Sequence, residues 1–180
     1  MKIEVYSDGS ATIASKPGGY GWVLVIDGVK VKEGNGHMPK ASNNDAELEA
    51  AIQGLAHVLK MRLNNQIPIG AHEIVLVSDS QIVLGWVTGA FRFKQKAKMQ
   101  KFEQLQYLVR KLNVKTRWVE GHTGDEHNER CDTLANMARK MYDTPKEKPA
   151  KVKPARVTLE SLLKRIETLE REVRILKEKS

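Results

Sequence analysis

The order of two hydrophobic periodicities along residues 1–142 limits most strongly what this chain can fold into. Alternating or continuous apolar runs, which are typical of strands, occur at 3–8, twice within 18–37, at 74–77 and at 114–119. Apolar residues at helical spacing occur at 44–60, 80–88, 96–112 and 126–142. This order of strands and helices predicts an α/β fold, a mixed sheet with helices packed on its faces.

Local signals within this order place a hairpin, an amphipathic helix and a buried strand. Asp27-Gly28 stands between two apolar runs and is a strong signal for the type I′ turn of a β-hairpin. Residues 44–60 gather their apolar side chains on one helical face, and the asparagine pair before Asp45 can cap this helix. The unbroken apolar run 74–77 predicts a strand that is covered on both faces.

Composition excludes several classes of protein. Of the 180 residues, 41% are apolar, which is enough to fill a core and excludes wholesale disorder. No run approaches the roughly 18 apolar residues of a membrane span, and the first residues lack the apolar stretch of a signal peptide. Cys131 is the only cysteine, so it cannot form an internal disulfide, and we expect a buried packing thiol. We therefore predict a soluble cytoplasmic protein with no membrane partner.

The sequence changes character after the last predicted helix. Residues 1–143 carry the strand and helix pattern, whereas 144–157 are rich in proline and lysine, which indicates an extended linker. In 158–180 apolar residues recur at spacings of three and four; they are Leu159, Leu162, Ile166, Leu169, Val173 and Leu176. This is the seam of a short coiled coil, and it predicts a homodimer. The alternative is that so short a helix folds back on its own domain or frays.

The positive charge is concentrated in the same C-terminal region. The chain has a net charge of +8, and residues 145–180 hold 11 basic and 6 acidic side chains. A basic excess favours a polyanionic partner such as a nucleic acid, although it can equally serve only to solubilise the surface.

Four carboxylates stand close to the ends of predicted strands and helices. Asp8 and Asp79 end strands, Glu47 lies in the first turn of the first helix, and Asp132 lies in the last helix. Each alone has an ordinary explanation as a turn former, a helix-dipole partner or a solvated residue. If the fold brings them together, their repulsion favours bound cations, and hard oxygen ligands select Mg²⁺ or Mn²⁺. The residues alone therefore allow a metal-dependent phosphoryl-transfer enzyme.

Several short motifs follow one another at compatible spacings. They are SDGS at 7–10, GGYG at 18–21, NNDAEL at 43–48, SDSQ at 78–81, GHTG at 121–124 and NERCD at 128–132. Each motif alone is weak, but together they resemble type I ribonuclease H over residues 1–142. The fold of that family, a five-stranded mixed sheet flanked by helices, agrees with the order of elements read above.

The resemblance implies an endonuclease that hydrolyses the RNA strand of RNA–DNA hybrids and leaves 5′-phosphate and 3′-hydroxyl ends. It implies four ligands for two Mg²⁺ ions, which Mn²⁺ can replace: Asp8, Glu47, Asp79 and Asp132. His122 matches a mobile histidine that assists proton transfer or product release, a role that suits imidazole near neutral pH. The alternative for His122 is an ordinary exposed loop histidine. Glu129 matches a position beside the metal site.

The resemblance also implies contacts with the substrate. The matching residues are Ser42, Asn43, Asn44 and Gln81, at positions that touch the backbone or minor groove of the hybrid. The wide minor groove displays the 2′-hydroxyls by which RNA is told from DNA. Capping of the first helix is the alternative role for the asparagine pair.

The chain departs from the family pattern in places. Ala14 stands where many members carry asparagine, and the stretch between Asp79 and Asp132 is too short for the basic helix with which some members grip DNA. Segment 91–98 mixes basic and aromatic residues instead, and we predict a reduced DNA-strand grip made by Arg92, Lys94, Lys96 and Trp86. The alternative is a solvated helix start whose phenylalanines belong to the core. We hypothesise that 144–180 restores affinity, the linker by attracting phosphates and the coil by dimerisation.

Two other functions stay open from the sequence. One is a catalytically silent module that binds RNA–DNA hybrids, although a pure binder gains nothing from carboxylates that face phosphates. The other is a different nuclease on the same fold, such as a resolvase or an integrase-like enzyme, which the 43–48 motif and the His122 loop argue against.

Overall fold

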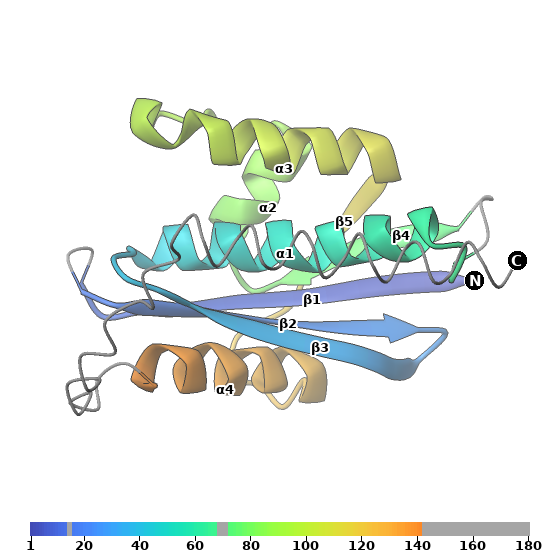
Figure 1. Cartoon of the computed structure of the whole chain (residues 1–180), viewed down its shortest axis with the longest axis horizontal. Coiled ribbons are helices and arrows are strands. Elements are labelled where there is room, and N and C mark those ends of the chain that lie inside the picture. The colour runs from blue at the N-terminus through green and yellow to red at the C-terminus, as the bar shows by residue number, and fades with distance from the viewer. Residues whose placement is uncertain (14–15, 68–71, 142–180) are drawn as a thin grey trace, which may run out of the picture. The chain divides into compact units, whose positions relative to one another are not determined.

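A single mixed sheet lies at the centre of the residues that the computed structural model describes, which are 1–13, 16–67 and 72–141. Its five strands are β1 (Lys2–Ala11), β2 (Gly18–Ile26), β3 (Val29–Met38), β4 (Glu73–Ser78) and β5 (Val114–Trp118). They lie in the order β3-β2-β1-β4-β5, with the β1–β2 and β2–β3 pairs antiparallel and the β1–β4 and β4–β5 pairs parallel (Figure 1). Ala14, the predicted linker and the predicted coiled coil lie outside the described residues.

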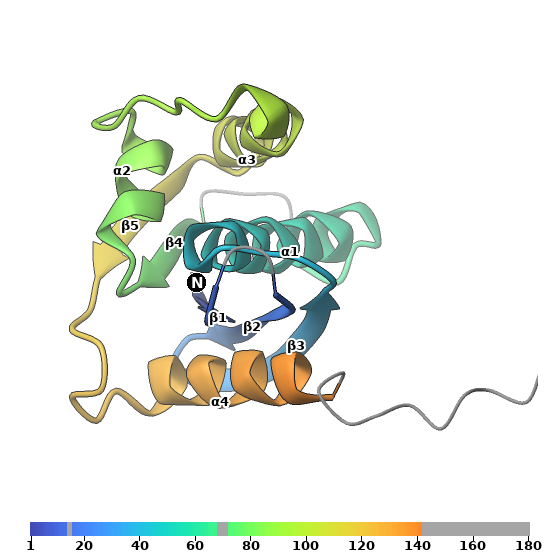
Figure 2. The same ribbon diagram turned by 90° about the vertical axis from the view of Figure 1, so that its left-hand side faces the viewer.

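Helices cover both faces of this sheet. They are α1 (Asn43–Leu63), α2 (Gln81–Thr88), α3 (Met99–Leu112), which follows the 3₁₀ turn η1 (Lys96–Lys98), and α4 (Glu126–Lys140). Figure 2 shows α1, α2 and α3 on one side of the sheet and α4 alone on the other. The predicted fold class, a five-stranded mixed sheet flanked by helices, is confirmed.

The alternation of side chains along the strands divides the core into two layers. Ile3, Val5, Leu24, Ile74 and Leu76 form one cluster with the apolar stripe of α1 and residues of α2 and α3. Tyr6, Val23, Val25, Val75 and Val77 form a second cluster with Cys131 and Leu134 of α4. Since β4 contributes to both clusters, the prediction of a strand covered on both faces is confirmed. Burial raises the pKa of the Cys131 thiol well above its usual value, as expected for a packing cysteine.

Most elements lie where the sequence pattern predicts, but β1 runs on to Ala11, the α-helix predicted from residue 96 begins at Met99, and one cap differs. Asp27 and Gly28 both have positive φ, 48° and 81°, which is what a type I′ hairpin turn requires. The helix predicted from residue 44 begins at Asn43, and Ser42 caps it in place of the asparagine pair. Among the described residues, none of the helices combines the length and the apolar character needed to cross a membrane.

Candidate active site

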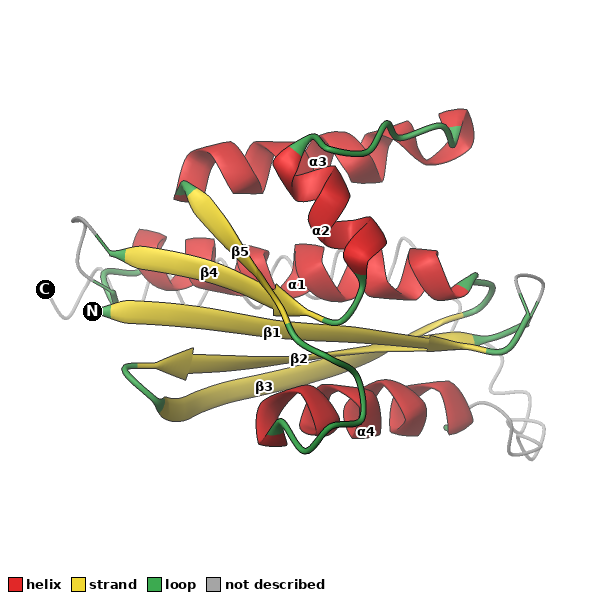
Figure 3. Cartoon of the chain, turned by 180° about the vertical axis from the view of Figure 1, so that it is seen from behind, coloured by secondary structure: helices red, strands yellow, loops and turns green. Residues whose placement is uncertain are grey.

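Strand register brings two of the four carboxylates to the same edge of the sheet. Figure 3 shows β1 and β4 side by side. Their last pair is Tyr6 with Val77, and Asp8 and Asp79 each stand two residues beyond it. In neighbouring parallel strands, two residues that follow a paired position by the same number of residues lie at the same level along the strands. Asp8, within β1, and Asp79, just after β4, therefore lie side by side. Because β1 continues to Ala11, the prediction that Asp8 ends its strand is wrong, whereas Asp79 does follow the last residue of β4.

Two glycines beside Asp8 bring the remaining carboxylates to the same place. A Cβ on Gly9 would lie 2.2 Å from the backbone nitrogen of Glu47, so the start of α1 can lie against β1 only because Gly9 has no side chain. Gly21 pairs with Asp8 across β1 and β2, and a Cβ there would lie 2.4 Å from the carbonyl oxygen of Cys131. Asp132 of α4 is thereby held next to Asp8, and the glycine motifs place both helices.

The four carboxylates line one cavity of about 420 Å³. The other lining residues are Gly9, Ser10, Asn43, Gly121, His122 and Asn136. Asp8 and Glu47 are buried, whereas Asp79 and Asp132 are half-buried. The predicted carboxylates and His122 therefore converge on one hollow, although they come from β1, α1, the end of β4, the loop after β5, and α4.

Neutral groups orient these carboxylates. The amide of Gly9 donates to Asp8 Oδ1 at 2.7 Å. Glu47 accepts from Asn43 Nδ2 at 2.7 Å and from Ser80 Oγ at 2.5 Å. Asn128 Nδ2 donates to Asp79 Oδ2 at 3.3 Å, and Asn136 Nδ2 donates to Asp132 Oδ1 at 2.7 Å. Within the described part of the chain, none of the ion pairs involves any of the four carboxylates.

The concentration of uncompensated charge shifts the ionisation of the buried acids. Burial, and then the nearby Asp79, Asp132 and Glu47, raise the pKa of Asp8 from 3.8 to about 8 against the lowering effect of the Gly9 amide. Burial raises the pKa of Glu47 as well, and Asp79 adds to the effect, while the hydrogen bond from Ser80 opposes it. Among the described residues, no three His, Cys, Asp or Glu side chains already stand as a preformed metal-binding group. The arrangement is thus a shared acidic cavity and not a closed set of ligands.

Comparison with known proteins agrees with this geometry. The family model for RNase H matches residues 1–140. The chain belongs to the ribonuclease H family. Among curated relatives, Ribonuclease H of Pseudomonas putida (strain W619) is 37% identical over 147 residues, which cover 74% of this chain and 90% of that one. Ribonuclease H of Pseudomonas fluorescens (strain Pf-5) is 35% identical over 74% of this chain and 89% of its own length.

Solved structures show the same fold. The crystal structure of RNase H1 from the archaeon Halobacterium salinarum has a TM-score of 0.66 and 31% identity, covering 78% of this chain and 99% of that one. LC11-RNase H1 in complex with an RNA/DNA hybrid also has a TM-score of 0.66, at 23% identity, over 77% of this chain and 97% of that one. The predicted enzyme class, a ribonuclease H, is confirmed by the family match and the curated relatives.

In this ribonuclease H, His122 lies in a short loop whose ends are fastened. It is exposed at the rim of the cavity and has a φ of 58°, a left-handed conformation that is uncommon for a residue with a side chain. The hydroxyl of Thr123 donates to the Glu120 carbonyl at 2.8 Å, and the Gly124 amide donates to Glu129 Oε1 at 3.0 Å. Glu129 therefore ties the His122 loop to α4 and is not among the residues that line the cavity.

The residues predicted to touch substrate occupy different surroundings. Asn43 lines the cavity; its Oδ1 accepts from the Ala11 amide at 3.2 Å while its Nδ2 holds Glu47. Ser42 forms a capping box with Asp45 and donates its hydroxyl to Asp45 Oδ2 at 2.6 Å. Asn44 is half-buried and does not line the cavity, and Gln81 is exposed and lines a separate hollow with Trp118 and residues of α2.

The basic segment before α3 divides into an exposed part and a packed part. Arg92, Lys94 and Lys96 are exposed, as a phosphate grip requires. Lys98 instead forms an ion pair with Asp45, and this pair, together with hydrogen bonds from Ser42, holds the pKa of Asp45 below its usual value against the raising effect of burial. The segment is thereby fastened beside the start of α1.

Trp86 does not have the environment that the sequence predicted. Its side chain is only 6% exposed and lies in the core cluster. Phe93 packs against the Trp86 ring, with centroids 5.0 Å apart, and stacks on Phe102 at 4.7 Å. Trp86 therefore offers little ring surface to the predicted DNA-strand grip, and Phe93 follows the alternative of a core phenylalanine.

Sequence reasoning missed the neutral residues that hold the carboxylates. Ser80, Asn128 and Asn136 each donate to one of them. Only Asn136 carried a readable signal, since it stands four residues after Asp132 and so on the same helical face. The hydrogen bonds of Ser80 and Asn128 join segments 33 and 49 residues apart.

Proposed function

We propose that this ribonuclease H hydrolyses the RNA strand of RNA–DNA hybrids and that Asp8, Glu47, Asp79 and Asp132 hold two divalent cations, Mg²⁺ in the first place. One observation carries the proposal. Four carboxylates from separate elements line one cavity, and within the described residues no side chain of the protein pairs with them as a cation.

The donor set fits a hard divalent cation. Carboxylate oxygens without sulfur or several imidazoles are the ligands that Mg²⁺ and Mn²⁺ take in proteins. The hydrogen bonds from amides and hydroxyls orient these oxygens but leave their charge in place. Because burial and mutual repulsion raise the pKa of Asp8 to about 8, a cation that enters the cavity relieves an unfavourable charge arrangement.

The chemistry is a hydrolysis in which every bond is accounted for. A water molecule gives up a proton as its oxygen bonds to phosphorus, the bond from phosphorus to the 3′-oxygen breaks, and the 3′-oxygen takes up a proton, which gives 5′-phosphate and 3′-hydroxyl ends. When bound, the cations supply a lowered pKa for the attacking water and positive charge at the leaving oxygen. His122, exposed at the rim of the cavity, is placed to accept or hand on a proton.

The choice of hybrid as substrate rests on relatives and on the lining residues. LC11-RNase H1, which shares this fold, is described in complex with an RNA/DNA hybrid. Asn43 lines the cavity at its exposed side and can reach 2′-hydroxyl or backbone oxygens of a bound RNA strand.

The test is a cleavage assay on an RNA–DNA hybrid, double-stranded RNA and double-stranded DNA, each with Mg²⁺ and then with EDTA. We expect cleavage of the RNA strand of the hybrid alone, lost with EDTA and lost in Asp79→Asn. Asp27→Asn is the matched control, because Asp27 lies in the exposed hairpin turn with a φ of 48°, which asparagine tolerates. Binding of hybrid without cleavage would identify a silent binding module, and equal cleavage of double-stranded DNA would identify a different nuclease.

We infer that Arg92, Lys94 and Lys96 contact backbone phosphates, because all three are exposed in the segment that Lys98 fastens beside the start of α1. Replacing Lys94 and Lys96 by glutamine should lower hybrid affinity and reduce its salt dependence by about one phosphate contact per lysine. Lys111→Gln, at the exposed far end of α3, is the control. An unchanged salt dependence would remove these lysines from the interface.

We also propose, from the sequence, that the basic linker (144–157) and the coil (158–180) add affinity to the catalytic domain (1–143). Deletion of residues 145–180 should weaken hybrid binding and flatten its salt dependence while cleavage at saturating substrate persists. Sedimentation of the full chain and of the deletion tests the dimer. Equal affinity for hybrid in both proteins would contradict the proposal.

A further inference from the structure

Hydrogen bonds through Asn136 link the guanidinium of Arg139 to the carboxylate of Asp132, and these two charged groups do not pair directly. Arg139 Nη2 donates to Asn136 Oδ1 at 3.1 Å, and Asn136 Nδ2 donates to Asp132 Oδ1 at 2.7 Å. Ser10 of β1 donates its hydroxyl to the same Asn136 oxygen at 2.7 Å. Ser10 and Asn136 both line the acidic cavity.

The chemistry of these partners fixes which way the Asn136 amide points. A guanidinium has donors only, so the amide oxygen must face Arg139, and the Ser10 hydroxyl supplies a second donor to that oxygen. The amide nitrogen is then directed at Asp132, to which it can only donate.

Asp132 needs such a partner more than the other carboxylates do. Asp8 and Glu47 are buried between strand and helix, whereas Asp132 is half-buried on the side of α4. A half-buried aspartate on a helix can turn its carboxylate toward solvent. Asn136, one helical turn further along, is itself anchored to β1 by Ser10 and can hold the carboxylate toward the cavity.

We propose that Asn136 is a positioning residue that keeps Asp132 aimed into the cavity for cation binding, with Ser10 and Arg139 fixing the orientation of its amide. The inference rests on the proposed function, since it assigns a task within the same site. A neutral amide suits this task because it orients the carboxylate and leaves its charge for the cation. A guanidinium in direct contact would compete with that cation.

The competing explanation is that Asn136 only helps to hold α4 on the sheet. Asn35 provides a matched control, because its Nδ2 donates to the Leu134 carbonyl of the same helix at 3.2 Å and it does not line the cavity. A structural role would make Asn136→Ala and Asn35→Ala alike in stability and cation binding. A positioning role separates them in cation binding.

The experiment compares Mn²⁺ binding to the full chain in the wild type, Asn136→Ala, Asn35→Ala and Ser10→Ala. Binding is measured by calorimetry and by the electron spin resonance signal of free Mn²⁺. We expect Asn136→Ala to bind Mn²⁺ about tenfold more weakly, the lower end of the usual loss when the partner of a metal ligand is removed. Ser10→Ala should show a smaller loss and Asn35→Ala none. In hybrid cleavage, the Mg²⁺ concentration for half-maximal rate should rise for Asn136→Ala, with the rate largely regained at high Mg²⁺.

The outcomes separate this inference from the proposed function. Wild-type Mn²⁺ affinity in Asn136→Ala, or an equal loss in Asn35→Ala, would overturn the positioning role while the proposed function stands. Failure of the wild type to bind Mn²⁺ would overturn the proposed function and this inference with it. If Asn136→Ala does not fold, Ser10→Ala decides, and unchanged binding in that variant would count against the role.

Discussion

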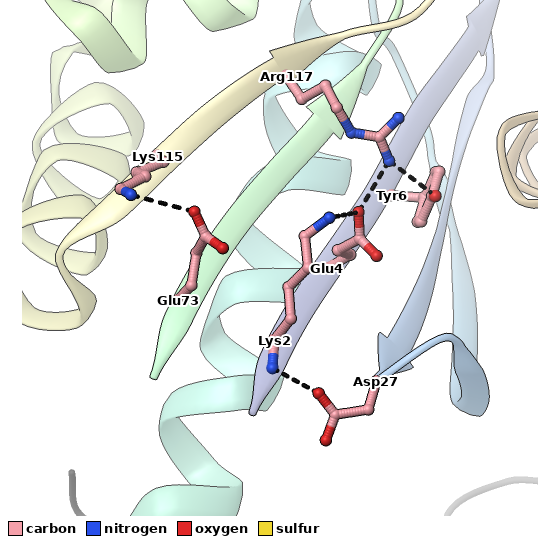
Figure 4. A network of polar contacts seen from close by, with 7 residues as sticks. All are labelled: Lys2, Glu4, Tyr6, Asp27, Glu73, Lys115 and Arg117. Atoms are coloured by element: carbon pink, nitrogen blue, oxygen red, sulfur yellow. Dashed lines mark hydrogen bonds and ion pairs between the residues drawn. The ribbon is translucent and has the colours of Figure 1, made fainter. Parts of the chain in front are cut away.

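Glu4 and Asp8 are two buried acids on the same face of the same strand, and their surroundings differ. Glu4 is 9% exposed and Asp8 is 7% exposed. Glu4 Oε1 lies 2.9 Å from Arg117 Nη2 and 3.0 Å from Lys2 Nζ, in the network that Figure 4 shows between β1 and β5. Asp8 accepts a hydrogen bond from the Gly9 amide, and within the described residues it has no cationic partner.

The difference shows two ways in which one strand carries a buried charge. Burying an ion costs several kcal/mol unless partners compensate it. Arg117 and Lys2 compensate Glu4 from within the protein. Burial and then the neighbouring carboxylates raise the pKa of Asp8 to about 8, and among the described residues no cationic side chain compensates its charge. This contrast separates a buried acid that the protein compensates with its own cations from one that, among the described residues, has none.

The largest effect is expected from exchanging each acid for its amide. Asp8→Asn should lower the rate of hybrid cleavage by at least about 10³-fold, because under the proposed function roughly 4 kcal/mol of transition-state stabilisation depends on the cations that Asp8 helps to hold. Glu4→Gln, on the same face of the same strand, should leave the rate per folded molecule near wild type and lower the free energy of unfolding. Steady-state cleavage and urea unfolding of both variants measure this, and a comparable loss of rate in Glu4→Gln would abolish the distinction.

The metal-free protein should lose stability as pH rises from about 5 to 8. Because the pKa of Asp8 is raised from 3.8 to about 8, the folded state keeps a proton that the unfolded chain has released in this range. The folded state binds more protons, so the free energy of unfolding falls with rising pH, by up to about 1.4 kcal/mol per pH unit for one group. Above pH 8 this contribution to the slope ends.

Urea unfolding in EDTA at several pH values measures the slope. Asp8→Asn should show a flatter dependence than the wild type, and Mg²⁺ should restore stability to the wild type at pH 8 by binding the folded state alone. If the free energy of unfolding depended on pH equally in both proteins, Asp8 would be ionised over the whole range from pH 5 to 8. Asp8 and Glu4 would then differ less than their neighbouring charges indicate.

Much of this arrangement could be predicted because it depends on local pattern and chain direction. The apolar run 74–77 and the Asp-Gly turn place β4 and the β2–β3 hairpin, and parallel register then sets Asp8 beside Asp79. The convergence of Glu47 and Asp132 was not readable from spacing. It depends on the close approach of α1 to Gly9 and of α4 to Gly21. The sequence shows these glycines, but it does not show which helix packs against each one.

Burial was harder to predict than position. Trp86 stands in a basic and aromatic stretch of sequence, yet its ring lies in the core because α2 and α3 close over it with Phe93 and Phe102. Lys98 belongs to the same basic segment as the predicted phosphate ligands Lys94 and Lys96, but it forms an ion pair with Asp45. Tertiary packing decides which of several similar side chains stays exposed, and the composition of a segment does not reveal that packing.

The smallest of these effects should come from removing one cation of the Glu4 network. Arg117→Met leaves Glu4 with Lys2 alone and takes the donor at 2.9 Å away from the Tyr6 hydroxyl, so we expect the free energy of unfolding to fall by about 1–2 kcal/mol. Lys115→Met breaks the exposed pair with Glu73 on the same strand β5 and should change stability too little to measure (Figure 4). Urea unfolding of both variants at pH 7 compares them, with hybrid cleavage unchanged per folded molecule in each. Equal stability in the two variants would mean that solvent, and not Arg117, compensates the charge of Glu4. The cationic partners of Glu4 would then no longer explain how its surroundings differ from those of Asp8.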